Sequence, residues 1–152
     1  ISNAINGLKI PIYGKGDQVR DWLYVEDHAR AIYLVLKKGV SGETYNIGGG
    51  NAFKNIDVVN EICKNMDKLI KNKPNNINSF LELIEFVEDR PGHDKKYAIN
   101  SNKIFLELNW KAKKTFSEGL KKTIIWYLKN DKWIKSVQDK SNYYSTRLGK
   151  LK

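Results

Sequence analysis

Segments with apolar residues at helical spacing alternate along this chain with short extended segments, and this alternation limits the folds that the chain can adopt. Four segments predict helices, at residues 27–38, 55–70, 101–108 and 115–128. Five short segments favour strands, at residues 11–13, 20–25, 44–48, 83–87 and 97–99. The pattern predicts an α/β fold, or an α+β-like one, in which about four helices pack with short strands.

Residues suited to helix ends flank three of the predicted helices. Asp27 is expected to cap the first helix, and Gly39 is expected to end it. Asn109 tolerates a left-handed backbone and is expected to end the third helix. Thr115 and Glu118 have the spacing of a capping box, which predicts the start of the fourth.

Two of these helices have clear apolar faces. The face of the first helix consists of Ala29, Ile32, Tyr33 and Leu36. The face of the second is a predicted core stripe of Val59, Ile62, Cys63, Met66, Leu69 and Ile70. Because Cys63 and Met66 belong to this stripe, we expect them to pack in the core and not to carry chemistry.

The 152 residues suffice for one domain with a hydrophobic core, expected at residues 1–135, followed by a basic tail at residues 136–152. No apolar run approaches the roughly 18–20 residues that cross a bilayer, and no secretion signal is recognisable, so a cytoplasmic protein without membrane contact is expected. A single cysteine cannot form an internal disulfide, and no Cys/His cluster has the spacing of zinc ligands. We expect no metal site.

The formal net charge of +10 raises the possibility of nucleic-acid binding. Half of that excess lies from Lys129 onwards, where seven basic residues accompany two acidic ones. The Lys-rich and Asn-rich tail shows no aromatic-basic platform and no recognised nucleic-acid-binding motif. A solvated lysine surface is therefore the expectation, and nucleic-acid binding is the less favoured alternative.

Three positions suit a diphosphate ligand: Arg20, Arg90 and Asn55 at a helix start behind a glycine-rich turn. Arginine presents a planar fork that matches phosphate oxygens, and helix N-termini supply free N–H groups. His93, in a Pro-Gly-His turn close to Arg90, is a further candidate contact. The alternatives are that Arg20 pairs with a carboxylate, that Arg90 lies on a surface turn and that Asn55 only caps its helix.

Common catalytic motifs are not recognisable in the sequence. The glycines at 14 and 16 lack the closing Gly-Lys-Ser/Thr of a nucleotide-hydrolase loop, and those at 48–50 do not complete a dinucleotide fingerprint. No Ser-His-Asp or Cys-His pair can be assigned. The residues themselves therefore predict binding and no catalytic group.

One long stretch, residues 11–30, resembles the stretch that marks the dTDP-glucose 4,6-dehydratases of the extended short-chain dehydrogenase/reductase superfamily. It reads Pro11-Ile12-Tyr13-Gly14-Lys15-Gly16-Asp17-Gln18-Val19-Arg20-Asp21-Trp22-Leu23-Tyr24-Val25-Glu26-Asp27-His28-Ala29-Arg30. Residues 45–49 followed by Asn55 are similar to a later strand and helix of that family, and residues 89–94 to its substrate loop. The resemblance extends over about residues 1–130 and implies the C-terminal, substrate-binding part of such an enzyme.

Carried over position by position, the resemblance implies a substrate site of seven residues. Those expected to line the nucleotide pocket are Pro11, Ile12 and Tyr13, with Tyr13 against the thymine. Those expected to hold the diphosphate and nearby groups are Arg20, Asn55, Arg90 and His93. In the turn after Gly49, the residues Gly50, Ala52 and Phe53 replace family residues that are often polar.

The resemblance also implies an NAD-dependent lyase that converts dTDP-glucose to dTDP-4-keto-6-deoxyglucose and water. The family's NAD-binding and catalytic segments are expected upstream of this chain, so we expect it to contain no catalytic or NAD-binding residue and to be inactive alone. The family implies a homodimeric parent, whereas this chain is expected to self-associate through exposed apolar faces. The alternatives are another nucleotide-sugar epimerase or dehydratase, and a basic interaction module without catalysis.

Overall fold

The computed structural model describes residues 1–141 and has a mixed α/β architecture. Its helices are α1 (Ser2–Ile5), α2 (Val25–Lys38), α3 (Asn55–Leu69), α4 (Asn102–Leu108), α5 (Phe116–Lys129) and α6 (Asp131–Ser141). Its strands are β1 (Ile10–Tyr13), β2 (Val19–Asp21), β3 (Ala52–Lys54) and β4 (Ile84–Val87), and two 3₁₀ turns are η1 (Pro74–Asn76) and η2 (Phe80–Leu83). The predicted fold class and the four predicted helices are confirmed; α1 and α6 are additional.

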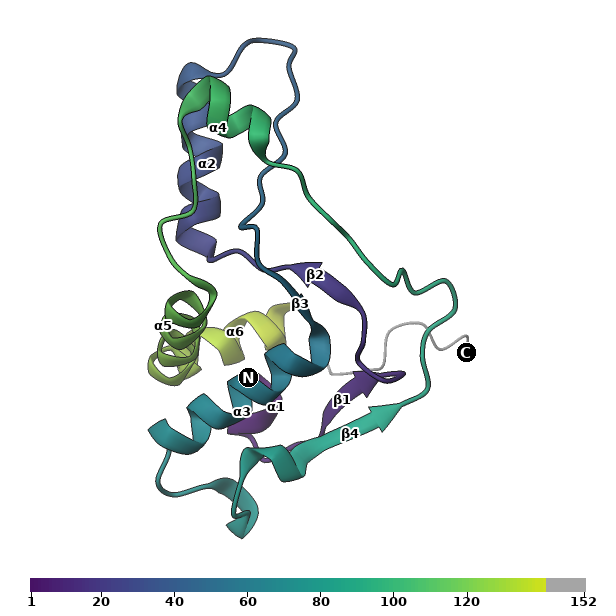
Figure 1. The fold of residues 1–152 in the computed structure, drawn as a ribbon. Coiled ribbons are helices and arrows are strands. Elements are labelled where there is room, and N and C mark those ends of the chain that lie inside the picture. The colour runs from purple at the N-terminus through teal and green to yellow at the C-terminus, as the bar shows by residue number, and fades with distance from the viewer. Residues whose placement is uncertain (142–152) are drawn as a thin grey trace.

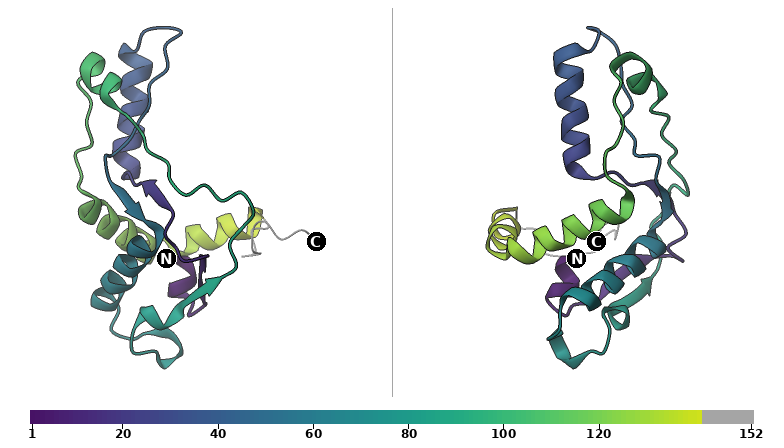
Figure 2. Two further views of the ribbon diagram at one scale, coloured as in Figure 1. Left: turned by 45° about the vertical axis from the view of Figure 1, so that its right-hand side comes forward. Right: turned by 60° about the vertical axis from the view of Figure 1, so that its left-hand side comes forward.

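The elements form two lobes (Figure 1). At one end α2 lies beside α4, and at the other α3 packs against α5 and η2 (Figure 2). The strands form two small sheets: β1 pairs in parallel with β4, and β2 pairs antiparallel with β3. The segment between β4 and α4 returns along the molecule and connects the lobes.

Each lobe has its own hydrophobic core. The larger core contains the buried side chains of Ala4, Cys63, Met66, Phe80, Leu83 and Ile124. The smaller contains Ala31, Ile104 and Trp110. Most of the predicted α3 stripe is therefore in the core, although Leu69 is exposed. Burial raises the pKa of the Cys63 thiol to about 11, which keeps it protonated and agrees with a packing role.

Three of the four predicted helix ends are confirmed by the structure. Gly39 follows the end of α2, Asn109 adopts the left-handed conformation after α4, and Thr115 and Glu118 form the reciprocal capping box of α5. The prediction that Asp27 caps α2 is wrong, because the helix begins two residues earlier at Val25. Asp27 therefore lies within the first turn of the helix.

Asp27 connects α2 to the segment that leads into α5. One of its carboxylate oxygens accepts a hydrogen bond from Arg30 at 2.6 Å, and the other accepts from the backbone N–H groups of Lys113 and Lys114, both at 2.9 Å. Burial acts to raise the pKa of Asp27, but these hydrogen bonds outweigh it and lower the pKa below the ordinary value. The carboxylate thus stabilises the fold as an anion.

Asp27→Ala is expected to lower the free energy of unfolding by about 2 kcal/mol, because charge-assisted hydrogen bonds are lost and two backbone donors remain unpaired. Since the folded-state pKa is lowered, this contribution is present above the ordinary aspartate pKa and is lost as the pH falls through the folded-state value. Urea unfolding at neutral and acid pH measures both effects. An equal loss in the exposed Glu85→Ala control would contradict the assignment.

Two predicted strands are absent from the described part of the chain. Residues 44–48 were expected to form a buried strand, but they have no ladder partner among residues 1–141 and form no regular structure there. Residues 97–99 were also expected to form a strand, and only a single bridge between Val19 and Lys96 forms nearby. Both segments are apolar enough for a strand, yet a strand also requires a neighbouring backbone to satisfy its hydrogen bonds.

The predicted apolar face of α2 is largely exposed. Ile32 is 52% exposed, Tyr33 61% and Leu36 80%, while the opposite face carries Ala31 into the smaller core. Adjacent apolar side chains in contact with water favour association. We therefore retain the expectation that the chain self-associates through this face.

Leu36→Glu is expected to raise the dissociation constant of such an assembly at least about tenfold, because burial of a leucine contributes about 1.5–3 kcal/mol. Light scattering over a concentration series measures the change. Leu8→Glu, an equally drastic change at another exposed leucine, is the control. A wild-type chain that stays monomeric at high concentration would refute the expectation.

The boundary expected after residue 135 falls within α6, which continues to Ser141. Trp133 of α6 packs edge-on against Trp126 of α5, with ring centroids 5.2 Å apart, and Gln138 donates a hydrogen bond to the Ser2 hydroxyl. The first residues of the expected tail are thus helical. Residues 142–152 lie outside the described part of the chain.

Candidate substrate site

The ends of β1 and β4 bring two predicted site segments to one edge of the parallel sheet. Tyr13, the last residue of β1, pairs with Val87, the last residue of β4. The next N–H along β1, that of Gly14, donates to the Val87 carbonyl at 2.9 Å. Because parallel strands end at the same edge, the turn after β1 and the loop at residues 89–94 lie side by side.

Asp89 organises that loop. One carboxylate oxygen contacts His93 Nδ1 at 2.7 Å and accepts a hydrogen bond from the Arg90 N–H at 2.9 Å. The other accepts from Gln18 Nε2 at 2.9 Å. The hydrogen bond from His93 is the main reason that the pKa of Asp89 lies below its usual range. His93 in turn lies edge-on to Tyr13, with ring centroids 6.3 Å apart.

Arg20, in the middle of β2, is held by neutral groups. Its guanidinium donates to the Val19 and Asp94 carbonyls, both at 2.8 Å, and lies 4.5 Å from the centroid of the Tyr97 ring. Within residues 1–141 no carboxylate lies in ion-pair distance of Arg20, so the alternative that it pairs with a neighbouring carboxylate is wrong for this part of the chain. Its positive charge is oriented but not neutralised.

Arg90 adds a second positive charge in the loop at residues 89–94, which also contains the Asp94 carbonyl that accepts from Arg20. The hydroxyl of Tyr97 hydrogen-bonds to Asp94, which raises the pKa of Tyr97, and the charges of Arg20 and Arg90 both oppose that rise. Arg90 is exposed and makes no ion pair among the described residues. Two arginines without carboxylate partners in this part of the chain, one of them bonded to the loop that carries the other, suit an anionic ligand.

Asn55 begins α3 as predicted, but the start of this helix is less open than the sequence suggests. The N–H groups of Asn55 and Ile56 donate to the carbonyls of Gln18 and Gly16, at 3.0 and 2.9 Å. These two donors are therefore unavailable to a ligand. A contact from Asn55 would instead come from its half-buried side-chain amide.

The turn at residues 14–18 requires glycine where it meets α3. Gly16 has a φ of +70°, and a Cβ added there would lie 2.7 Å from Ile12 Cγ2 and 2.9 Å from Ile56 Cβ. This close contact packs β1 onto the start of α3. Ile12 is consequently buried, whereas Pro11 is exposed and Tyr13 half-buried. Ligand contacts from these three residues stay a prediction.

The family model described as GDP-mannose 4,6 dehydratase matches residues 1–123. The chain belongs to this family. It is 57% identical over 149 residues to a dTDP-glucose 4,6-dehydratase of Escherichia coli, covering 98% of this chain and 41% of the relative. It is 50% identical over 149 residues to the dTDP-glucose 4,6-dehydratase of Neisseria meningitidis serogroup B, covering 98% and 42%.

Solved structures of the same group of dehydratases share the fold. A dTDP-glucose 4,6-dehydratase from Bacillus anthracis in complex with NAD has a TM-score of 0.71 at 47% identity. The enzyme DesIV from Streptomyces venezuelae, with NAD and TYD bound, has a TM-score of 0.73 at 35% identity. Each match covers 87% of this chain and 38% of the other. The dehydratase-family chain thus spans about two fifths of the length of its relatives.

Sequence reasoning missed three residues that build the site of this dehydratase-family chain. Gln18 and Asp89 hold the two segments together, and the ring of Tyr97 packs against the guanidinium of Arg20. Asp89 opens the loop that carries Arg90 and His93, so its position was a usable signal. Gln18 gave none, because a buried glutamine in a polar turn has no periodicity to reveal it.

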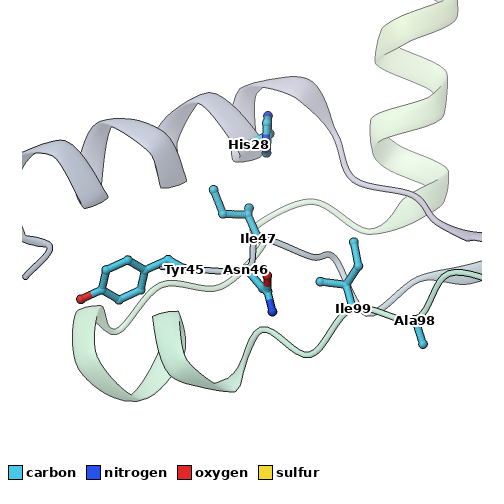
Figure 3. Close-up of a pocket in the computed structure, with 6 residues that line it drawn as sticks. All are labelled: His28, Tyr45, Asn46, Ile47, Ala98 and Ile99. Carbon is cyan, nitrogen blue, oxygen red and sulfur yellow. The ribbon is translucent and has the colours of Figure 1, made fainter. Parts of the chain in front are cut away.

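A hollow elsewhere in the dehydratase-family chain includes none of the seven predicted site residues. Figure 3 shows its lining, which consists of His28, Tyr45, Asn46, Ile47, Ala98 and Ile99.

The described residues contain no cluster of His, Cys, Asp and Glu side chains that could hold a metal ion. No helix in the same part of the chain is long and apolar enough to cross a membrane.

Proposed function

We propose that this chain is the substrate-binding portion of a dTDP-glucose 4,6-dehydratase, a lyase that converts dTDP-glucose to dTDP-4-keto-6-deoxyglucose and water. The observation that carries the proposal is Arg20, which lacks a carboxylate partner within residues 1–141 and is oriented by the Tyr97 ring and by the carbonyl of Asp94, in the loop that carries Arg90. The identity of 57% to an Escherichia coli enzyme of that name supports the choice of nucleotide.

In the proposed complex the diphosphate lies between Arg20 and Arg90, whose guanidinium groups match phosphate oxygens. The side chain of Asn55 donates a further hydrogen bond, Nε2 of His93 accepts one from a hydroxyl group of the nucleotide, and Tyr13 packs against the thymine. Pro11 and Ile12 shape the strand that carries Tyr13. The contribution to catalysis is the orientation of the sugar nucleotide, because a fixed geometry lowers the entropic part of the barrier.

NAD is the proposed cofactor of the whole enzyme, where it accepts and returns a hydride. The glycine turn of this chain does not fit a dinucleotide. The N–H groups of Gly49, Gly50 and Asn51 already donate to the Asp21 carboxylate, at 2.9, 3.4 and 2.9 Å, so they are not available to a pyrophosphate. We propose no catalytic and no NAD-binding residue here, and we expect no turnover from the chain alone.

Calorimetric titration of the purified chain with dTDP, UDP and GDP tests the proposal. Tighter binding of dTDP than of the other two is expected. Preference for GDP is the outcome that the description of the family model would favour. Preference for UDP would favour a relative of the UDP-bound WbmF of Bordetella bronchiseptica, which has 26% identity and a TM-score of 0.66. Either preference would overturn the choice of dTDP-glucose.

The other class of function, a basic interaction module, is tested with a DNA duplex in the same assay. Saturable binding of DNA, together with dTDP binding that is unaffected by Arg20→Ala and Arg90→Ala, would favour that alternative.

We also propose that the whole enzyme is a homodimer in the cytoplasm. The reduced, buried Cys63 is compatible with that compartment.

A further inference from the structure

We propose that Asp89 is a positioning residue that orients His93 toward the substrate. The inference rests on the proposed function, since it concerns how one predicted ligand contact is held. Asp89 itself is not proposed to touch the ligand, because both of its carboxylate oxygens are engaged by protein groups. It would act on the substrate only through the imidazole of His93.

The geometry at His93 fixes which ring nitrogen is free. Nδ1 lies 2.7 Å from Asp89 Oδ1, so in the neutral ring this nitrogen carries the proton and donates it to the carboxylate. The side chain of His93 is only 6% exposed, which limits its rotation. Nε2 is then the nitrogen that a ligand can meet. The edge-on contact with Tyr13 places this ring beside the residue proposed to contact the base.

Two residues of the turn that follows β1, Gly14 and Gln18, hold Asp89 in place. Gln18 is 3% exposed, and its Nε2 donates to Asp89 Oδ2 and, at 3.4 Å, to the Tyr13 carbonyl. Gly14 has a φ of +57°, and a Cβ added there would lie 2.9 Å from Asp89 Oδ2. The turn thus presents a donor to the carboxylate and leaves room for it. Asp89 therefore connects the loop at 89–94 to the end of β1.

The orientation of Gln18 has an energetic cost. With Nε2 directed at two acceptors, its buried Oε1 has no hydrogen-bond partner among the described residues. A buried, unpaired carbonyl destabilises the fold, and such groups call for an explanation. The hydrogen bond to Asp89 explains this orientation of Gln18, since the amide nitrogen is the only donor of the glutamine side chain.

The test compares dTDP binding by calorimetry in Asp89→Ala, Asp89→Asn and the control Glu85→Ala. Asp89→Ala is expected to weaken binding about tenfold, the equivalent of one lost hydrogen bond between His93 and the ligand. Asp89→Asn is expected to stay within about threefold of wild type, because its amide oxygen still accepts from His93 and Gln18 can turn its unpaired oxygen toward the new amide. Unchanged binding in Asp89→Ala would overturn the proposal.

A double-mutant cycle separates orientation of His93 from a general effect on the fold. In a His93→Ala background, Asp89→Ala is expected to change the dissociation constant by less than about twofold, because its effect passes through the imidazole. A full tenfold loss in that background would show that Asp89 acts by another route and would overturn the assignment.

A measurement without ligand tests the orientation of His93 independently of the proposed function. Nitrogen-15 chemical shifts of His93 are expected to report a protonated Nδ1 in the wild type and a changed tautomer or fast exchange in Asp89→Ala. If the wild type does not bind dTDP, the proposed function fails, while the histidine shifts still decide whether Asp89 orients the ring. Identical shifts in both proteins would refute the orientation.

Discussion

Arg20→Ala is expected to weaken the binding of dTDP on the order of 30-fold, about 2 kcal/mol, because two charge-assisted hydrogen bonds to the diphosphate are lost. The side chain is already oriented by the Val19 and Asp94 carbonyls and by the ring of Tyr97, so little entropy is lost when the ligand binds. Arg20→Lys keeps the charge without the planar fork, and its affinity for dTDP is expected to lie between those of the wild type and Arg20→Ala.

Calorimetry measures these affinities, and Lys129→Ala is the matched control because it removes one positive charge from the exposed side of α5. Arg20 also holds the segment near Asp94, so circular dichroism of each variant must show a folded chain. Equal losses in Arg20→Ala and Lys129→Ala would mean that only net charge matters, and the diphosphate site would be wrong.

Phe80→Ala is expected to lower the free energy of unfolding by about 3–5 kcal/mol, the largest effect of any single change considered. Phe80 is fully buried in the larger core between α3 and α5. Its backbone N–H donates to Asp67 at 3.0 Å, and Ser79 before it also donates to Asp67 at 2.6 Å, so the surroundings are held in place and cannot collapse into the cavity.

Urea unfolding followed by circular dichroism measures this loss. Phe105→Ala, at a phenylalanine that is 48% exposed on α4, is expected to cost less than about 1 kcal/mol. Because Phe80 supports α3, its replacement is also expected to disturb Asn55. Similar losses in the two variants would contradict the assignment of the larger core.

The helices could be predicted from the sequence because their signals are local. The capping box of Thr115 and Glu118 and the left-handed Asn109 depend on a few neighbouring residues, and the structure contains both. Phe80 could not be predicted as a core residue, since it follows the polar segment 71–78 and has no periodic neighbours. Its burial depends on packing against α3 and on a core cluster shared with Ala4 and Ile124, which lie outside its own segment.

The strands were less predictable because pairing is not local. Residues 44–48 have the composition of a buried strand, yet the described chain gives them no partner, and the Asp21 carboxylate takes the N–H groups that follow. The position of Asp27 was misjudged for a similar reason. Its partners, Lys113 and Lys114, lie far along the chain, so the residues around Asp27 could not indicate them.

The site residues were named mainly through resemblance, and physical reasoning alone pointed only to Arg20, Arg90, Asn55 and His93. The pattern could not indicate that the first N–H groups of α3 are already bonded, because Gly16 and Gln18 supply carbonyls only once the turn has folded. For the same reason the role of Asp89 emerges from the structure.

We propose that dTDP binds between β2, the start of α3 and the loop at residues 89–94. An amide NMR titration of the chain with dTDP tests this location. Saturable shifts are predicted at residues 11–13, Arg20, Asn55 and residues 89–94, with little change around the hollow near His28 and Asn46. Shifts that cluster at that hollow, or no saturable shifts at millimolar dTDP, would contradict the claim.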